Sequence, residues 1–206
     1  TDLEQWRTAI TADTRAVFFE SISNPALEVI NIKAVSDLAH EVGALVVVDN
    51  VFATPVFSRA VEQGADLIIY STTKHVDGQG RTLGGVILGS AALIRETVEP
   101  YMKHTGGSMS PFTAWMMVKS LETIDLRVRA QTATALALAE ALADHPKLHR
   151  MIYPGHCSHP QHALVEQQIG EGGTVLSIDV AGGQEATFKF LNALQIVIIS
   201  NNLGDA

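Results

Sequence analysis

Short apolar runs bounded by polar residues limit the fold of this chain more than any other feature. Residues 44–48 (ALVVV) and 66–70 (DLIIY) are two of these runs, and residues 15–20 and 84–89 form two more. Runs without polar alternation are typical of strands that are buried on both faces. Residues 31–42 lie between two of the runs and carry apolar side chains at helical spacing. Strands that alternate with helices predict an α/β fold with a largely parallel sheet covered on both faces.

The later part of the chain has the pattern of a smaller α/β unit attached through long helices. Residues 111–121 and 125–143 are rich in Ala and Leu, which are strong helix formers. We therefore predict two units: residues 1–121, part of a large domain, and residues 122–206, a long linking helix with part of a C-terminal domain. The pattern of the second unit predicts strands near 151–153, at 174–180 and at 196–199, and helices near 161–169 and at 184–194.

Composition and charge exclude several classes of protein. Hydrophobic residues make up 47% of the chain and charged residues 17%, which is typical of a globular protein. The chain has 14 Lys and Arg against 22 Asp and Glu, a net charge of −8, and no basic run, so we expect no nucleic-acid partner. No apolar stretch approaches the roughly 20 residues that span a bilayer. The single Cys157 excludes an internal disulfide and indicates a reducing, cytoplasmic location.

Polar side chains gather where two predicted strands end. Asp49 follows one strand, and Ser71, Thr73 and Lys74 follow the next. If these strands are neighbours, the side chains meet at one edge of the sheet, where open α/β sheets bind ligands. A partly buried lysine attacks aldehydes, a carboxylate keeps a pyridine nitrogen protonated, and hydroxyls bind phosphate, which together suit pyridoxal 5′-phosphate (PLP). Such residues at strand ends are also common as solvated surface groups, so spacing alone leaves both interpretations open.

Several segments add a resemblance to a known family. Residues 66–80 (DLIIYSTTKHVDGQG) closely resemble the PLP-attachment signature of the Cys/Met metabolism family of PLP-dependent enzymes. Residues 20–25 (ESISNP) are similar to the family's E-x-x-x-N-P turn, and residues 48–55 (VDNVFATP) to its V-D-N-x-x-x-T-P segment. Residues 153–162 and 202–205 follow in family order. The resemblance implies a fold type I, three-layer αβα large domain with part of a smaller α/β C-terminal domain.

The resemblance also implies a role for each matching residue. Lys74 would bind PLP covalently and later move protons on the substrate. Asp49 would pair with the ring nitrogen, and Asn24 would donate to the phenolic oxygen of the ring. Ser71 and Thr73 would hold the phosphate.

The loop after the lysine indicates a subfamily. Residues 75–81 (HVDGQGR) are most similar to the O-succinylhomoserine sulfhydrylases of the family. This implies a γ-replacement in methionine biosynthesis, in which O-succinylhomoserine and sulfide give homocysteine. Asn202 stands where the family places a contact to the carboxylate of the amino-acid substrate. Members also commonly pair two dimers into a tetramer, so the resemblance implies a homotetramer.

Two other functions remain open at this point. One is a β- or γ-lyase of the same family that acts on cystathionine or methionine. The other is a catalytically inert fragment that serves only in subunit interaction, because family members are nearly twice as long and both ends look cut. We expect no metal site, since the spacing within the cluster His156, Cys157, His159 and His162 fits no standard zinc pattern.

Overall fold

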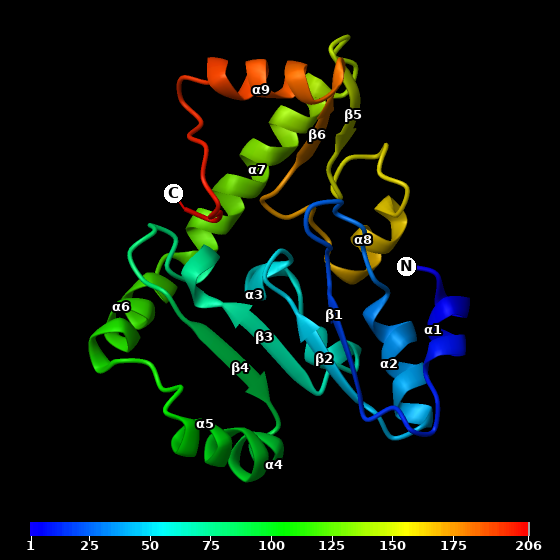
Figure 1. The fold of residues 1–206 in the computed structure, drawn as a ribbon, viewed down its shortest axis with the longest axis vertical. Helices are drawn as coiled ribbons and strands as arrows, with labels where there is room; N and C mark the ends of the chain where they lie inside the picture. The colour runs from blue at the N-terminus through cyan, green and yellow to red at the C-terminus, as the bar shows by residue number, and fades with distance from the viewer. Residues whose placement is uncertain (206) are drawn as a thin grey trace.

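Two β-sheets joined by one long helix form the framework of the protein (Figure 1). The structure, a computed structural model, describes residues 1–205, and Ala206, the end of the predicted second unit, lies outside the described residues. The first sheet has four strands in the order β1-β2-β3-β4, and the second pairs β5 with β6. The strands of the first sheet are β1 (Ala16–Glu20), β2 (Leu45–Asp49), β3 (Leu67–Ser71) and β4 (Gly85–Gly89).

Strands β1, β2 and β3 are parallel, as the sequence predicts. In the register of the sheet, Glu20 lies opposite Asp49, and Asp49 lies opposite Ile69. The connections between these strands contain α2 (Ile32–Glu41), α3 (Thr54–Phe57) and the 3-10 turn Ala60–Gln63. The carboxyl ends of the three strands therefore meet at one edge.

Strand β4 departs from the parallel arrangement that the sequence predicts. It runs antiparallel to β3, with Gly85 opposite Ser71. A parallel neighbour would need a crossover back to the other end of the sheet, usually through a helix. The connection 72–84 instead stays at the carboxyl edge, where it forms a short turn and a loop. The sheet is therefore mixed.

One face of the first sheet forms the main core with α2. Val17, Val46 and Ile68 are buried there among the side chains of Val35 and Ala39. Helix α1 (Leu3–Ala9) packs at the edge of this core. The rings of Trp6 and Phe19 pack edge to face there, with their centroids 5.6 Å apart. Phe18 alternates with the core residues of β1 and points to the opposite face, where it is 62% exposed.

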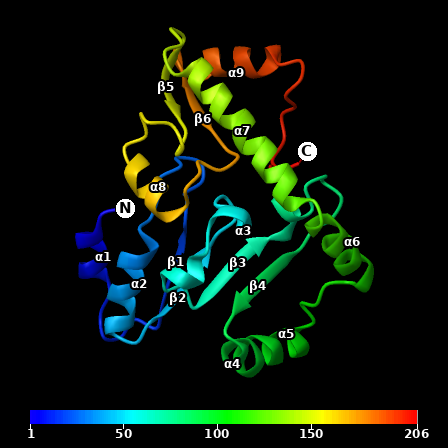
Figure 2. The same ribbon diagram turned by 180° about the vertical axis from the view of Figure 1, so that it is seen from behind.

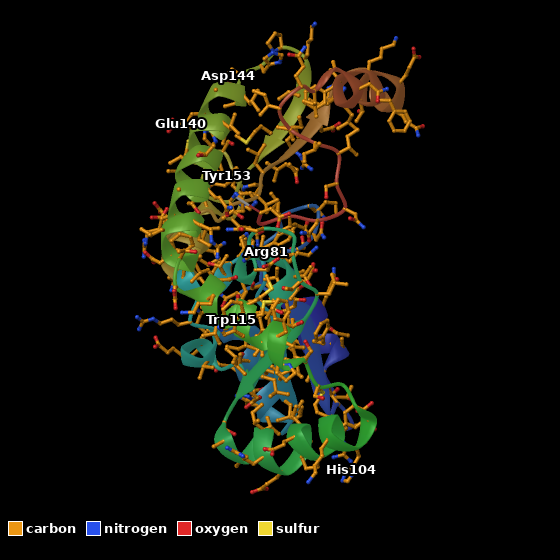
Figure 3. The ribbon with its side chains drawn as sticks, turned by 90° about the vertical axis from the view of Figure 1, so that its left-hand side faces the viewer. Arg81, His104, Trp115, Glu140, Asp144 and Tyr153 are labelled. Atoms are coloured by element: carbon orange, nitrogen blue, oxygen red, sulfur yellow. The ribbon has the colours of Figure 1, made fainter. Side chains whose placement is uncertain are left out.

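The long helix α7 (Ile124–Leu142) links the two sheets and runs diagonally across the molecule (Figure 2). Tyr153 anchors the second sheet to α7, because its buried hydroxyl lies 3.4 Å from the carbonyl oxygen of Thr132 and 2.8 Å from that of Gly173 (Figure 3). The remaining elements are α4 (Ala91–Leu93), a π-helical turn (Ile94–Val98), α5 (Glu99–Thr105), α6 (Pro111–Leu121), β5 (Leu148–Ile152), α8 (His162–Gln168), β6 (Ser177–Val180) and α9 (Gly183–Ala193).

The strand predicted at residues 196–199 does not form. This segment follows α9 as an irregular stretch, and its side chains are largely exposed, with Ile196 at 95%. A strand is stable only when its backbone pairs with a neighbour, and no strand among residues 1–205 pairs with it. Across the same described residues, no helix is both long and apolar enough to cross a bilayer.

Candidate active site

Lys74 lies on a short π-helical turn, Thr72–Val76, that follows β3 directly and is called the lysine turn below. The backbone of Lys74 has φ −87° and ψ −125°, outside the helical region. Two bonds of 2.8 Å close the turn: the N–H of Asp77 donates to the carbonyl of Thr72, and that of Gly78 donates to the carbonyl of Lys74. The turn therefore holds Lys74 at the carboxyl edge of the parallel strands.

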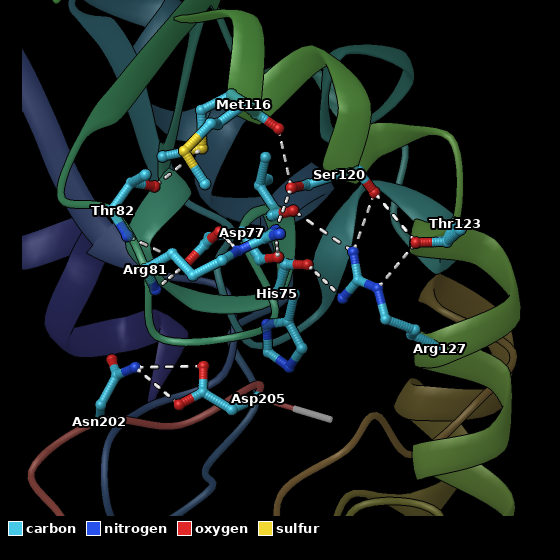
Figure 4. A network of polar contacts seen from close by, with 12 residues as sticks. His75, Asp77, Arg81, Thr82, Met116, Ser120, Thr123, Arg127, Asn202 and Asp205 are labelled. Atoms are coloured by element: carbon cyan, nitrogen blue, oxygen red, sulfur yellow. Dashed lines mark hydrogen bonds and ion pairs between the residues drawn. The ribbon is translucent and has the colours of Figure 1, made fainter. Parts of the chain in front are cut away.

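Asn202 contacts Lys74 although the two residues lie 128 positions apart. The Nζ atom of Lys74 donates to Oδ1 of Asn202 at 2.7 Å. The amide of Asn202 in turn lies 3.3 Å from both carboxylate oxygens of Asp205 (Figure 4). A cavity of about 330 Å³ opens beside this pair, within the size range of small-molecule sites. Its lining consists of Thr73, Lys74, Gly80, Arg81, Thr82, Leu83, Asn201 and Asn202.

Gly204 allows the C-terminal segment to come this close. A Cβ atom at position 204 would lie 2.7 Å from the backbone nitrogen of His75, and the φ of Gly204 is +87°. Both the close approach and the left-handed conformation favour glycine. This contact keeps residues 202–205 against the lysine turn.

Asp49 ends β2, the strand next to the one that precedes Lys74. Its half-buried carboxylate accepts a hydrogen bond of 3.1 Å from the N–H of Val51. Burial raises the pKa of Asp49, the nearby carboxylate of Glu20 raises it further, and the bond from Val51 opposes this. Within residues 1–205 the carboxylate forms no ion pair. A protonated ring nitrogen would supply the missing positive charge, so Asp49 fits the predicted partner of PLP.

The hydroxyl groups at the end of β3 and in the lysine turn also fit a phosphate group. Ser71 is half-buried, and its hydroxyl bonds no group of the described chain. The hydroxyl of Thr73 accepts a hydrogen bond of 3.0 Å from the N–H of Gly84, and it donates only a long hydrogen bond of 3.4 Å to the carbonyl of Gly84. The hydroxyl of Thr72 is buried and also lacks a partner among residues 1–205. Hydroxyl donors without strong acceptors suit a phosphate oxygen.

Asn24 is a predicted site residue whose side chain forms no hydrogen bond with the other predicted site residues in the described chain. It follows β1 at the same edge of the sheet, and its backbone N–H donates to the carboxylate of Glu20 at 2.9 Å. Its side chain is exposed, and no hydrogen bond among residues 1–205 joins it to Lys74 or Asp49.

The His-rich loop after β5 serves other contacts. The ring of His159 bonds the carbonyl of Leu27 at 3.1 Å, and the ring of His162 bonds that of Pro154 at 3.2 Å. In the part of the chain that the structure describes, no group of three or more His, Cys, Asp and Glu side chains could hold a metal ion.

The structure contains a polar network around the lysine turn that the sequence analysis does not predict. Asp77 is fully buried and pairs with Arg81 at 3.0 Å, and Arg81 also donates to the hydroxyl of Ser120 at 2.7 Å. Arg127 reaches the same region from α7 (Figure 4). The four-residue spacing of Asp77 and Arg81 around two glycines could have indicated their pairing. Nothing local in the sequence points to Arg127.

His75, the residue after the lysine, is buried and neutral. Its Nε2 atom bonds the hydroxyl of Thr174 at 2.6 Å, and its Nδ1 atom has no partner among residues 1–205. The pKa of His75 is lowered to about 4: burial lowers it most, the charges of Arg127 and Lys74 also lower it, and the charge of Asp205 opposes them. The imidazole therefore carries no charge at neutral pH.

The chain matches the model of one family, Cys/Met metabolism PLP-dependent enzyme, over its whole length, residues 1–206. The lysine, acid and hydroxyls described above lie at the strand ends of this chain. The chain belongs to this family, whose members depend on PLP. The prediction from the sequence motifs is thus confirmed.

The chain is similar to relatives of known activity and structure. It is 46% identical to an O-succinylhomoserine sulfhydrylase of Mycobacterium tuberculosis and 38% identical to an L-methionine gamma-lyase of Pseudomonas putida, in each case over 100% of this chain and 52% of the relative. A cystathionine gamma synthase structure from Xanthomonas oryzae pv. oryzae matches with a TM-score of 0.96 and 32% identity, over 100% of this chain and 53% of that one. The chain thus spans about half the length of these relatives, and the predicted fold class is confirmed.

Proposed function

We propose that this protein binds PLP through Lys74 and catalyses a γ-replacement that makes homocysteine from O-succinylhomoserine and sulfide. The observation that carries the proposal is the placement of Lys74 and Asp49 at the carboxyl ends of two neighbouring parallel strands. The greater identity to a sulfhydrylase than to a gamma-lyase supports replacement over elimination.

Each side chain of the site has a task in this proposal. When bound, PLP would withdraw the electrons that are released as protons leave the substrate, so that the γ-substituent can leave with its own electron pair. The amine of Lys74 binds the cofactor, and once free it moves protons between substrate atoms. Asp49 keeps the ring nitrogen protonated, and Ser71 and Thr73 donate to the phosphate.

The two asparagines complete the proposed site. Asn24 would donate to the phenolic oxygen of the ring from the turn after β1. Asn202 would contact the carboxylate of the substrate. Because Asn202 now accepts a hydrogen bond from Lys74, it would have to exchange this bond for one to the substrate. The same contact places Asn202 within reach of the reacting amine.

The test uses the complete protein loaded with PLP, O-succinylhomoserine and sulfide. We expect homocysteine and succinate as products, and a mass increase on Lys74 after borohydride reduction. Lys74→Ala should lose the mass increase, the visible absorbance and turnover together; Lys103→Ala, on α5, should lose none of them. A keto acid as the main product would indicate a lyase instead. A complete protein that takes up no PLP would support the inert alternative.

We also propose that the protein works as a homotetramer of two dimers in the cytoplasm. The cavity beside Lys74 has no aromatic residue in its lining. Among the tyrosines, Tyr70 is buried and bonded to Asn50, and Tyr153 is held against α7. No tyrosine of residues 1–205 lines this cavity, so we propose that a neighbouring subunit supplies the group that covers the cofactor ring.

A further inference from the structure

Arg127 directs its whole guanidinium group at backbone and hydroxyl oxygens around the lysine turn (Figure 4). Nη1 donates to the carbonyl of His75 at 2.8 Å, and Nη2 lies 3.3 Å from the carbonyl of Val76. These are the two carbonyls that directly follow Lys74 in the chain. The carbonyls of Thr72 and Lys74 are already bonded within the turn, and Arg127 bonds the next two carbonyls of the segment.

The same guanidinium also holds the junction between two helices. Nη2 donates to the carbonyl of Ser120 at 3.0 Å, and Nε donates to the hydroxyl of Thr123 at 3.1 Å. Ser120 lies in the last turn of α6, where the carbonyl groups carry partial negative charge, and its carbonyl also accepts a hydrogen bond of 3.2 Å from the N–H of Thr123. One cation thus ties the end of α6 and the start of α7 to the lysine turn.

Arg127 does not act as one half of an ion pair. The buried carboxylate of Asp77, the nearest acid of the network, is already paired with Arg81. Among residues 1–205, Arg127 forms no salt bridge. Its hydrogen bonds go instead to three carbonyls and one hydroxyl. A planar fork of donors suits this set of acceptors, and the single ammonium group of a lysine would not reach all of them.

Gly78 shows that the backbone is shaped around this side chain. A Cβ atom at position 78 would collide with the guanidinium group of Arg127, and the φ of Gly78 is +64°. A side chain at this position would therefore displace Arg127 from the carbonyls that it bonds. The loop after Lys74 and the arginine of α7 fit each other only with glycine there.

We propose that Arg127 is a positioning residue for Lys74. By holding the carbonyls of His75 and Val76, it fixes the backbone from which the lysine amine reaches the cofactor. The inference rests on the proposed function, in which Lys74 binds PLP covalently. We therefore expect that loss of Arg127 slows the formation of the covalent bond between Lys74 and PLP, while the pocket still binds the cofactor non-covalently.

The experiment compares two kinds of binding in the complete protein. PLP is removed, PLP is added back, and the covalent product is trapped with borohydride over time and measured by intact mass. The affinity for pyridoxamine 5′-phosphate, which has no aldehyde and forms no bond with lysine, reports the pocket alone. In Arg127→Met we expect covalent loading about 10- to 100-fold slower, because small misplacements of a reacting group have effects of this size. The affinity for pyridoxamine 5′-phosphate should stay within about twofold.

Two further variants sharpen the comparison. Arg127→Lys should recover part of the loading rate, since it keeps the charge but not the fork. Arg129→Met removes a neighbouring arginine of α7 that pairs with Asp125 at the surface, and it should load at the parent rate. Gly78→Ala should repeat the selective loss of Arg127→Met, because it displaces the guanidinium group.

Several outcomes overturn the inference. One is covalent loading of Arg127→Met at the rate of the parent protein. Another is an equal loss of loading rate and of pyridoxamine 5′-phosphate affinity, which would indicate a general structural role. If Arg127→Met does not fold, covalent loading of Gly78→Ala at the rate of the parent protein would overturn the inference. A parent protein without any mass increase on Lys74 would instead contradict the proposed function.

Discussion

Acid should destabilise this protein through His75, a residue that is buried next to Lys74. The folded pKa is about 4, below the value of about 6.5 of an exposed histidine. Between these values the unfolded chain binds a proton that the folded chain does not, so stability rises with pH there. The contribution of the neutral imidazole is complete above about pH 6.5 and is lost as the pH falls toward about 4.

The size of this effect follows from the two pKa values. Their difference corresponds to about 3 kcal/mol at about 1.4 kcal/mol per pKa unit. Most of it, about 2 kcal/mol or more, should be lost between about pH 7 and about pH 4.5. Other groups titrate in the same range, so the loss must be measured against a variant that has no imidazole. His75→Gln keeps an amide that can bond Thr174 and does not titrate.

The assay is urea unfolding of the complete protein and of His75→Gln at several pH values and one fixed protein concentration. A fixed concentration is needed because assembly adds to the apparent stability. We expect the free energy of unfolding of the parent to fall by about 2 kcal/mol more than that of the variant over this range. Parallel curves for the two proteins would refute the buried, neutral state of His75.

Two other predictions concern the site and the assembly. Asp49→Ala should still form the covalent bond between Lys74 and PLP but turn over at least about a hundredfold more slowly, since each pKa unit lost at the ring nitrogen corresponds to about 1.4 kcal/mol. Asp49→Glu should be milder, and equal rates in Asp49→Ala and the parent, measured at saturating PLP, would remove Asp49 from the site. Dilution of the complete enzyme should release PLP and activity together as subunits separate; light scattering that finds a fully active monomer would contradict the proposed assembly.

Local sequence determined the parts of the protein that depend on neighbouring residues. The apolar runs of β2 and β3 form strands because branched side chains favour them and no polar residue interrupts them. Asp49 ends β2 and Lys74 follows β3, and parallel pairing brings the strand ends to one edge. Helix α6 occupies residues 111–121 as predicted, with Ser110 as its cap and Pro111 at its first position. The family motifs added the cofactor, which spacing alone left open.

Only the tertiary structure decided how distant segments meet. The apolar run 84–89 has the same composition whichever way it pairs, and the return of the chain to the carboxyl edge made β4 antiparallel. The apolar run 196–199 lacks a pairing partner among the described residues and forms no strand. Asn202 and Arg127 reach the lysine turn from positions far along the chain. Such contacts depend on how whole elements pack, because hydrogen-bond partners and strand directions are chosen among distant segments, and no local pattern of side chains records that choice.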